Sequence, residues 1–282
     1  MTNHHIQILS QLEDLARDAS RLLVEYCKAS LGELGVAWKG ENDPVTEADK
    51  AVHELCATRL RSILPDVPLV GEEGGADEGA GEFWSLDPLD GTSEFVERLG
   101  EWAFQLALVH EGRPVVGVVA LPAVDRVYVA VAGLGCKAGQ ISTWELEPFE
   151  SFAPLRKERL VLTRSMPRRP SLQALVEAHP ATEAVLLGGV GYKVHAVLAG
   201  EGDTYFAVPR TLHPWDLAAP LLVAREAGLC CKTLSGKDPL VPADRSSIPE
   251  GLLVTRAQWL ERNLEFFARP ETVELVAKKD PR

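Results

Sequence analysis

The segment with the clearest potential for chemistry is residues 84–95, which reads Trp-Ser-Leu-Asp-Pro-Leu-Asp-Gly-Thr-Ser-Glu-Phe. The apolar run to Leu86 predicts the end of a buried strand, and Pro88 predicts a sharp turn after it. Asp87 and Asp90 are three residues apart across that turn, where both carboxylates can point at one spot. Two desolvated carboxylates repel each other, and a hard cation such as Mg²⁺, Mn²⁺ or Ca²⁺ relieves that repulsion. The pair therefore predicts a divalent metal site.

The residues that follow Asp90 predict an anion site next to the metal. Gly91 lets the backbone pass close to a ligand. Thr92 or Ser93 can begin a helix, whose free N–H groups would then face an anion such as phosphate. Taken alone, an Asp-Pro-x-Asp-Gly-Thr segment is equally typical of a surface turn with a helix cap.

Acidic residues also stand at the ends of other expected elements. Asp49 lies at the start of a helix, Glu72 and Glu73 follow a short strand, and Asp216 begins a helix after Trp215. Each has an ordinary structural explanation when it is taken alone. These explanations are a capping box for Asp49, a solvated loop for the two glutamates, and a helix-dipole acid beside a packed aromatic ring for Asp216.

The elements that must position these residues follow from hydrophobic periodicity and from turn residues. The first half predicts helices at 4–31 and 46–63, a loop at 36–45, a strand at 69–70, a mobile loop at 74–82, an antiparallel meander over 102–132 and a turn at 133–139. The second half predicts strands at 160–163, 184–187 and 204–208 that alternate with helices at 170–178, 191–199 and 215–227. The fold class is therefore α/β (α+β), with a mixed or antiparallel first sheet and a smaller second α/β sheet. We place the boundary between an N-terminal half, residues 1–150, and a C-terminal half, residues 151–282, in the proline-containing stretch 141–158.

Composition limits the classes of partner. The 282-residue chain carries a formal net charge of −12, which disfavours a nucleic-acid polymer or an anionic membrane as its main partner. A small phosphorylated metabolite remains compatible, because a bound metal can dominate the local field. No window approaches the roughly 20 apolar residues of a spanning helix, and the N-terminus lacks a secretory signal pattern. Five scattered cysteines favour reduced thiols and a cytoplasmic location.

Four segments, taken together, resemble the inositol monophosphatase superfamily in order and approximate spacing. They are Thr46-Glu47-Ala48-Asp49, Gly71-Glu72-Glu73, Asp87-Pro88-Leu89-Asp90-Gly91-Thr92 and Trp215-Asp216-Leu217-Ala218-Ala219. The resemblance covers roughly residues 36–275. It implies a layered αβαβα sandwich of the sugar-phosphatase type, lithium-sensitive and magnesium-dependent hydrolysis of a phosphomonoester, and a possible homodimer.

The resemblance also implies a role for each matching residue. Glu72, Asp87 and the Leu89 carbonyl would hold one Mg²⁺, and Asp87, Asp90 and Asp216 a second, with Mn²⁺ as a possible substitute. Glu73 would orient a water ligand of the metals, and a hydroxyl of Thr92 paired with Asp49 would position the attacking water. The N–H groups of Gly91, Thr92 and Ser93 would take the phosphate, and Lys39 would lie near a weaker third metal. A metal pair suits this reaction because it activates water and clamps the attacking and leaving oxygens.

Substrate choice rests on the second half of the chain. Inositol phosphatases carry a glutamate seven residues before the aspartate of Trp-Asp, and Pro209 occupies that position here. Glu94-Phe95 and the segment from Gly188 to Lys193 instead resemble the 3'(2'),5'-bisphosphate nucleotidase branch. Lys193 and Arg210 could receive a second phosphate, or they could be ordinary surface charge. Inositol 1-phosphate or another sugar phosphate is the alternative substrate.

Two features of the sequence are compatible with a function other than a phosphatase. Gly189-x-Gly191 after a strand suggests a dinucleotide-binding turn, but Val194 occupies the third glycine position and no suitable acid follows. The same fold could also serve as a non-catalytic regulator that binds metal or phosphate. All the acids are present, so the sequence favours a magnesium-dependent phosphatase.

Overall fold

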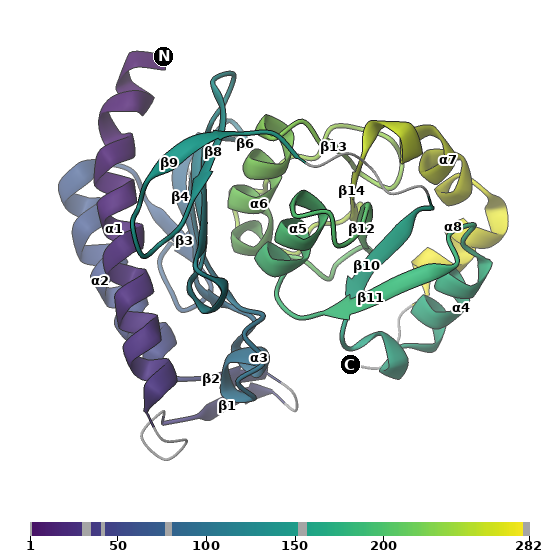
Figure 1. Cartoon of the computed structure of the whole chain (residues 1–282), viewed down its shortest axis with the longest axis horizontal. Coiled ribbons are helices and arrows are strands. Elements are labelled where there is room, and N and C mark those ends of the chain that lie inside the picture. The colour runs from purple at the N-terminus through teal and green to yellow at the C-terminus, as the bar shows by residue number, and fades with distance from the viewer. Residues whose placement is uncertain (1, 30–34, 41–42, 77–80, 152–156, 279–282) are drawn as a thin grey trace.

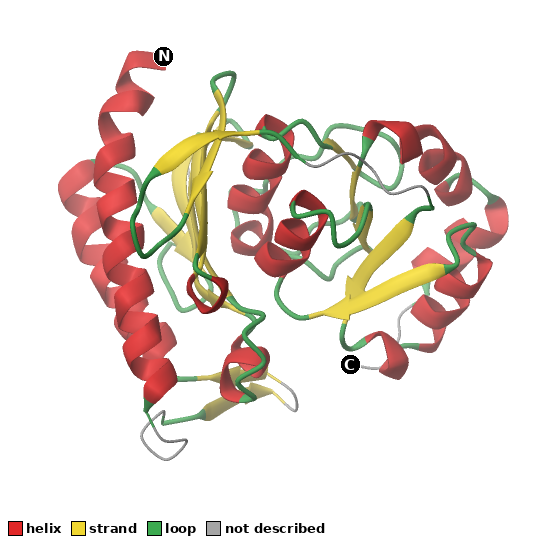
Figure 2. Cartoon of the chain, viewed as in Figure 1, coloured by secondary structure: helices red, strands yellow, loops and turns green. Residues whose placement is uncertain are grey.

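The computed structural model describes residues 2–29, 35–40, 43–76, 81–151 and 157–278. Its helices and strands form five layers in the order α, β, α, β, α (Figures 1 and 2). The expected α/β sandwich is therefore confirmed. Helices α1 (Thr2–Lys28) and α2 (Glu47–Ile63) cover the outer face of the first sheet, and α5 (Val190–Leu198) and α6 (Pro214–Glu226) lie between the sheets. Helices α4 (Pro170–Ala178), α7 (Ala257–Phe267) and α8 (Pro270–Ala277) cover the second sheet.

The first sheet has seven strands in the order β3-β4-β5-β6-β7-β8-β9. Only β3 and β4 pair in parallel, and the remaining neighbours are antiparallel, as the expected meander requires. The strands are β3 (Leu69–Gly71), β4 (Glu82–Asp90), β5 (Ala103–His110), β6 (Arg113–Leu121), β7 (Arg126–Val131), β8 (Gly135–Gly139) and β9 (Leu146–Phe149).

Three local predictions in the first half were wrong. The turn expected at 133–139 contains β8, and β9 lies in the proline-containing stretch 141–158, where the sequence analysis predicts no strand. The glycine-containing strand β8 pairs with β7 and β9, and the proline-containing strand β9 lies at the sheet edge and pairs with β8. In both strands, pairing outweighs weak local propensity. The loop expected at 36–45 contains the antiparallel pair β1 (Ala37–Gly40) and β2 (Asp43–Val45). The loop expected at 74–82 falls partly on residues 77–80, which lie outside the described residues.

The second sheet has five strands in the order β11-β10-β12-β14-β13. Strand β10 pairs in parallel with β11 and β12, whereas β14 is antiparallel to β12 and β13. The expected alternation of strands and helices is confirmed through α6, and the sequence pattern predicts no element beyond that helix. The strands are β10 (Arg159–Thr163), β11 (Glu183–Leu187), β12 (Thr204–Ala207), β13 (Cys230–Lys232) and β14 (Leu252–Thr255).

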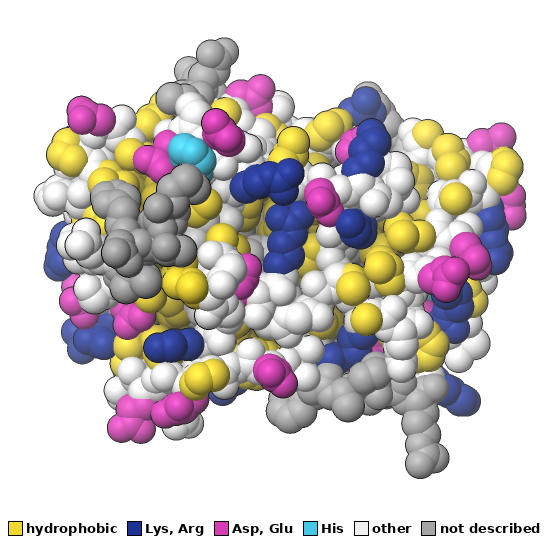
Figure 3. Space-filling model, turned by 90° about the horizontal axis from the view of Figure 1, so that it is seen from above, with side chains coloured by type: hydrophobic (Ala, Val, Ile, Leu, Met, Phe, Trp, Pro, Cys, Tyr) yellow, Lys and Arg dark blue, Asp and Glu magenta, His cyan; other side chains and the backbone are white. Residues whose placement is uncertain are grey.

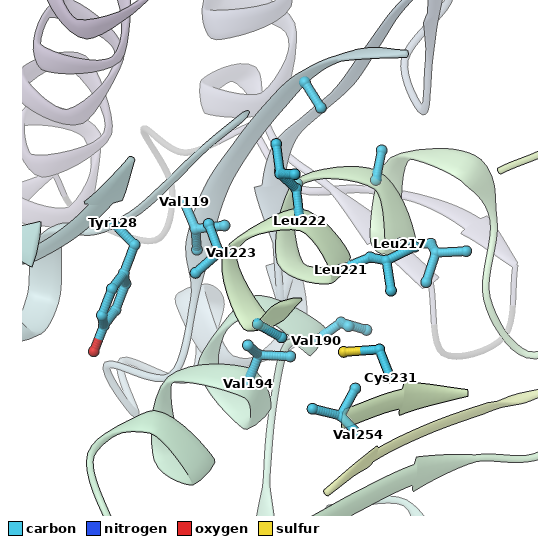
Figure 4. Packing of buried hydrophobic residues seen from close by; sticks show 14 of the residues in the cluster. Val119, Tyr128, Val190, Val194, Leu217, Leu221, Leu222, Val223, Cys231 and Val254 are labelled. Atoms are coloured by element: carbon cyan, nitrogen blue, oxygen red, sulfur yellow. The ribbon is translucent and has the colours of Figure 1, made fainter. Parts of the chain in front are cut away.

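Helix α6 joins the two sheets through a common core. It is buried on nearly all sides, so its apolar residues do not form a single stripe. Figure 4 shows Leu222 and Val223 of this helix near Val119 of β6. The helix comes very close to that strand at Gly117, where an added Cβ would lie 3.4 Å from Ala219 Cα. This close packing fixes the start of α6 relative to the first sheet.

The surface carries charges of both signs. The face in Figure 3 has Lys and Arg side chains near its middle and Asp and Glu side chains around them. Among the described helices, none is both long enough and apolar enough to cross a membrane.

A histidine links α5 to the first sheet. His195 Nδ1 lies 2.8 Å from the Tyr128 hydroxyl oxygen. Burial lowers the pKa of His195 to about 4, and the Arg126 guanidinium adds to the shift. The native imidazole is therefore neutral at neutral pH.

This shift predicts a loss of stability in mild acid. As the pH falls, His195 of the unfolded chain takes up a proton at about pH 6.5, whereas the native imidazole does so only near pH 4. The contribution of neutral His195 to the free energy of unfolding is therefore complete above about pH 6.5 and is lost as the pH falls towards 4. Between about pH 7.5 and pH 4.5, the free energy of unfolding measured in urea should fall by about 2 kcal/mol more for the wild type than for His195→Gln, whose side chain does not titrate. Parallel losses in the two proteins would contradict this account.

Candidate active site

Strand β4 extends further than the sequence predicted. The expected end at Leu86 was wrong, because β4 continues through Pro88 to Asp90. The pairing of β4 with β5 is irregular at this point, so the missing N–H of Pro88 falls where the ladder is already interrupted. The metal-binding candidates therefore lie on a buried strand and not across a surface turn.

The irregularity brings Asp87 and Asp90 to the same side of the sheet. Asp87 pairs with Gln105 and Asp90 with Ala103, so three steps along β4 match two along β5. In a regular strand, residues three apart point to opposite faces. One extra residue in a bulge reverses that alternation, which allows both carboxylates to face one site.

Asp216 completes a three-carboxylate cluster. It lies in the first turn of α6, and its Oδ2 accepts a hydrogen bond of 2.6 Å from the His213 backbone N–H. One ligand oxygen each from Asp87, Asp90 and Asp216 lie within 4.8 Å of one another. Asp87 and Asp90 are buried, and Asp216 is partly exposed. A set of carboxylate oxygens at this spacing fits a hard divalent cation such as Mg²⁺ or Mn²⁺.

The electrostatics of the cluster favour a cation. Burial raises the pKa of Asp87 well above its usual range, and the Glu72, Asp90 and Asp216 carboxylates raise it further. Burial likewise raises the pKa of Asp216, and the negative charge of Asp90 is the next largest cause of that rise. Full ionisation of the cluster is therefore unfavourable without a neighbouring positive charge.

Asp90 is held by the N-terminus of α5. Its Oδ1 accepts a hydrogen bond of 2.8 Å from Val190 N, and its Oδ2 accepts one of 2.6 Å from Gly191 N. A Cβ at Gly189 would lie 2.5 Å from Asp90 Oδ2. The Gly189-x-Gly191 turn, which resembled a dinucleotide site, therefore cradles a carboxylate of the protein itself. The sequence showed the two glycines but gave no sign of this long-range partner.

Asp49 and Thr92 meet beside the cluster. The Thr92 hydroxyl lies 3.2 Å from Asp49 Oδ1 and 3.1 Å from the Leu89 carbonyl oxygen, and it can donate a hydrogen bond to either. Asp49 Oδ2 accepts hydrogen bonds of 2.7 Å from Thr46 N and 2.6 Å from Thr46 Oγ1, so the expected capping box is also present. The two oxygens of Asp49 thus face different partners, and a cap and a hydroxyl contact coexist.

Glu72 and Glu73 follow β3 and are both partly buried. Glu72 lies outside the three-carboxylate cluster, but its charge raises the pKa of Asp87 and of Asp216. Glu73 instead raises the pKa of Asp49. The charges of the two glutamates therefore act on different parts of the site, Glu72 on the carboxylate cluster and Glu73 on Asp49.

Sequence reasoning missed Arg245, which connects two of the acid-bearing segments. Its Nη2 donates a hydrogen bond of 3.0 Å to the Glu72 carbonyl oxygen. Its guanidinium lies 5.4 Å from the ring centroid of Trp215, and that ring stacks on His213. No short motif surrounds Arg245, so the sequence carried no signal for this contact.

The predicted phosphate cradle begins at a left-handed residue. Gly91 has φ 90°, and a Cβ there would lie 2.8 Å from the Glu101 carbonyl oxygen. The short helix α3 (Thr92–Val96) follows at once, so Ser93 lies in its first turn. Glycine is therefore required at the point where the chain leaves β4.

The three basic candidates lie in different surroundings. Lys193 is buried, 6% exposed, and its Nζ donates a hydrogen bond to the Gly188 carbonyl oxygen. This differs from the accessible position that contact with a second phosphate would require. Arg210 is exposed, with φ 61°, on the loop between β12 and α6. Lys39 belongs to β1, and its side chain lies outside the described residues.

Comparison with known proteins places this arrangement in a family. The model of the inositol monophosphatase family matches residues 5–265. The 3'(2'),5'-bisphosphate nucleotidase CysQ of Escherichia coli K12 is 32% identical over 247 residues, which cover 85% of this chain and 96% of that protein. The histidinol-phosphatase of Chlorobaculum parvum is 30% identical over 238 residues, which cover 82% of this chain and 87% of that protein.

A solved structure gives the same result for the fold. An IMPase/NADP phosphatase complexed with Mg²⁺ and phosphate superimposes with a TM-score of 0.74 and 20% identity, over 93% of this chain and 95% of that chain. Similarity at this identity concerns the fold. Together with the family match over most of the sequence, it shows that the chain belongs to the inositol monophosphatase family.

Proposed function

We propose that this protein is a magnesium-dependent phosphomonoesterase that acts on a 3'(2'),5'-bisphosphate nucleotide. The observation that carries the proposal is the convergence of Asp87, Asp90 and Asp216 within 4.8 Å, in a chain of the inositol monophosphatase family. Its relatives include a named nucleotidase and a named histidinol-phosphatase, so hydrolysis of a phosphate ester is common to both.

The acids divide into a metal-holding set and a water-positioning set. Asp87, Asp90 and Asp216 would hold Mg²⁺, with Glu72 and the Leu89 carbonyl completing the ligands. A structural relative complexed with Mg²⁺ and phosphate supports this choice of metal. Bound Mg²⁺ would offset the charge of the phosphate and lower the pKa of a water ligand. The number of ions, two or three, is part of the proposal.

Side chains and backbone N–H groups of the protein would orient the attacking water and the phosphate. The Thr92 hydroxyl can donate its hydrogen bond to Asp49 Oδ1, which leaves a lone pair on Thr92 Oγ1 free to accept a hydrogen bond from the attacking water. A proton lost by that water would pass to Thr92 Oγ1 as the Thr92 proton passes to the Asp49 carboxylate. The charge of Glu73 acts on the same Asp49 carboxylate, and Glu73 would orient a water ligand of the metals. The N–H groups of Gly91, Thr92 and Ser93 would hold phosphate oxygens, because the turn at Gly91 opens a helix.

The choice of a nucleotide rests on the chain's departures from the inositol pattern. Pro209 replaces the glutamate expected to grip sugar hydroxyls, and the neighbouring Arg210 is exposed and available to a phosphate group. Identity of 32% to a bisphosphate nucleotidase supports the same choice. A second candidate is histidinol phosphate, which the 30% identity to a histidinol-phosphatase favours.

We also propose that the protein works in a reducing compartment, the cytoplasm. All five cysteines are free thiols in the structure. Burial raises the pKa of Cys136 and of Cys231 to about 12, so these thiols stay protonated and unreactive.

Removal of one cluster charge should abolish the reaction. In Asp87→Asn the amide oxygen can still accept the 3.0 Å hydrogen bond from Leu89 N, but the negative charge is lost. We expect kcat to fall at least about 100-fold, because several kcal/mol of charge stabilisation disappears. Phosphate release at saturating Mg²⁺ measures this, with the exposed Asp238→Asn as control. Wild-type turnover by Asp87→Asn would refute the site.

A methyl group added at Gly189, in the second half of the chain, should displace Asp90 and weaken metal binding. The new Cβ would lie 2.5 Å from Asp90 Oδ2, so Asp90 must move away from the cluster. We expect Gly189→Ala to weaken Mg²⁺ binding about 10- to 100-fold by calorimetry, the range typical when a supporting contact of a metal site is lost. Gly81→Ala is the matched control, because an added Cβ there would have no atom within 4 Å. Equal Mg²⁺ affinities in the two variants would show that Asp90 is not a ligand.

A substrate panel tests the choice of alcohol. Phosphate release should be fastest from 3'-phosphoadenosine 5'-phosphate, compared with inositol 1-phosphate, fructose 1,6-bisphosphate and histidinol phosphate, and Li⁺ should inhibit it. The reason is the missing sugar-binding carboxylate at Pro209. A higher kcat/KM for inositol 1-phosphate would overturn the nucleotide assignment and leave the metal chemistry intact.

A further inference from the structure

The buried lysine of α5 has surroundings that neither substrate binding nor surface charge explains. Lys193 is 6% exposed, and its Nζ donates a hydrogen bond to the Gly188 carbonyl oxygen. The Nζ also lies 5.7 Å from the ring centroid of Tyr205. A buried ammonium is costly unless negative charge compensates for it.

Four carboxylates provide that negative charge. The charges of Asp90, Glu94, Asp216 and Glu101 all act on Lys193 and favour its ammonium form. Two of these belong to the metal-binding cluster, and the other two lie on the side of Gly188. Burial lowers the pKa of Lys193, and these carboxylates oppose that effect.

The backbone under Lys193 is held tightly. Gly188 N donates a hydrogen bond of 2.8 Å to Glu101 Oε2, and Gly189 N donates one of 3.2 Å to the Glu101 carbonyl oxygen. A Cβ at Gly188 would lie 2.4 Å from Glu94 Cγ. The carbonyl that receives the ammonium therefore has little freedom to move, and it belongs to the turn whose amides hold Asp90.

We propose that Lys193 is a positioning residue, a counter-cation that holds the carboxylate cluster together before Mg²⁺ binds and that weakens Mg²⁺ binding by repulsion. The ammonium and the metal neutralise the same acids. Because coupling between two bound charges is reciprocal, a neutral side chain at this position must destabilise the metal-free protein more than the metal-bound protein.

The inference rests on the proposed Mg²⁺ site, and the test separates the two. Mg²⁺ affinity is measured by calorimetry, and the melting temperature is measured in EDTA and at saturating Mg²⁺. The variants are Lys193→Met, which keeps the length of the side chain, and Lys193→Arg, which keeps the charge. The control is Arg256→Met, which removes a buried cation whose Nε lies 3.1 Å from Asp203 Oδ1, outside the carboxylate cluster.

We expect Lys193→Met to bind Mg²⁺ about tenfold more tightly than the wild type, within the range typical of coupled sites. Its melting temperature should fall in EDTA and recover in large part with Mg²⁺. Lys193→Arg should bind Mg²⁺ like the wild type, and Arg256→Met should lose the same number of degrees in both conditions.

Unchanged or weaker Mg²⁺ binding by Lys193→Met, or an equal loss of melting temperature with and without Mg²⁺, would overturn the inference. A wild type that binds no Mg²⁺ would instead overturn the proposed function. If Lys193→Met does not fold in EDTA, Mg²⁺ during refolding should rescue it and Lys193→Gln alike. Failure of both variants to fold at saturating Mg²⁺ would also contradict the inference.

Discussion

The site depends on the repulsion among three carboxylates that the fold holds within 4.8 Å of one another in a largely buried place. Repulsion of this kind grows as solvent is excluded, so each carboxylate needs donors that keep it in position. The structure supplies backbone N–H groups for all three and adds one buried ammonium. The donors are Leu89 N for Asp87, Val190 N and Gly191 N for Asp90, and His213 N for Asp216.

This constraint explains why the segments that form the carboxylate cluster come from both halves of the chain. The bulge in β4 turns Asp87 and Asp90 to one side of the sheet. The carboxylate of Asp90 is held in place by hydrogen bonds from the N-terminus of α5, which belongs to the second half of the chain. Asp216 reaches the cluster because α6 is buried between the sheets. Neither sheet forms the site without the other, so packing of the middle helices contributes directly to the geometry of the acids.

The sequence allowed the acids, the order of most helices and strands and the class of fold to be predicted, because each depends on local pattern or on motifs with fixed spacing. Asp-Pro-Leu-Asp-Gly-Thr marked the centre of the site, although the turn expected there is a bulged strand. Long-range contacts could not be predicted. Two of these contacts join residues far apart in the chain, Asp90 with the Gly189-x-Gly191 turn and Arg245 with Glu72. The burial of Lys193 likewise depends on packing that the local sequence does not show. The edge strand β9 was missed because its weak local propensity is overcome by pairing.

The most direct test of the central claim is an anomalous difference map from crystals of the wild-type protein grown with Mn²⁺, which shares the oxygen-ligand preference of Mg²⁺. The account predicts anomalous peaks in contact with the carboxylates of Asp87, Asp90 and Asp216. A map without a peak at these residues, or with Mn²⁺ bound only elsewhere, would contradict it.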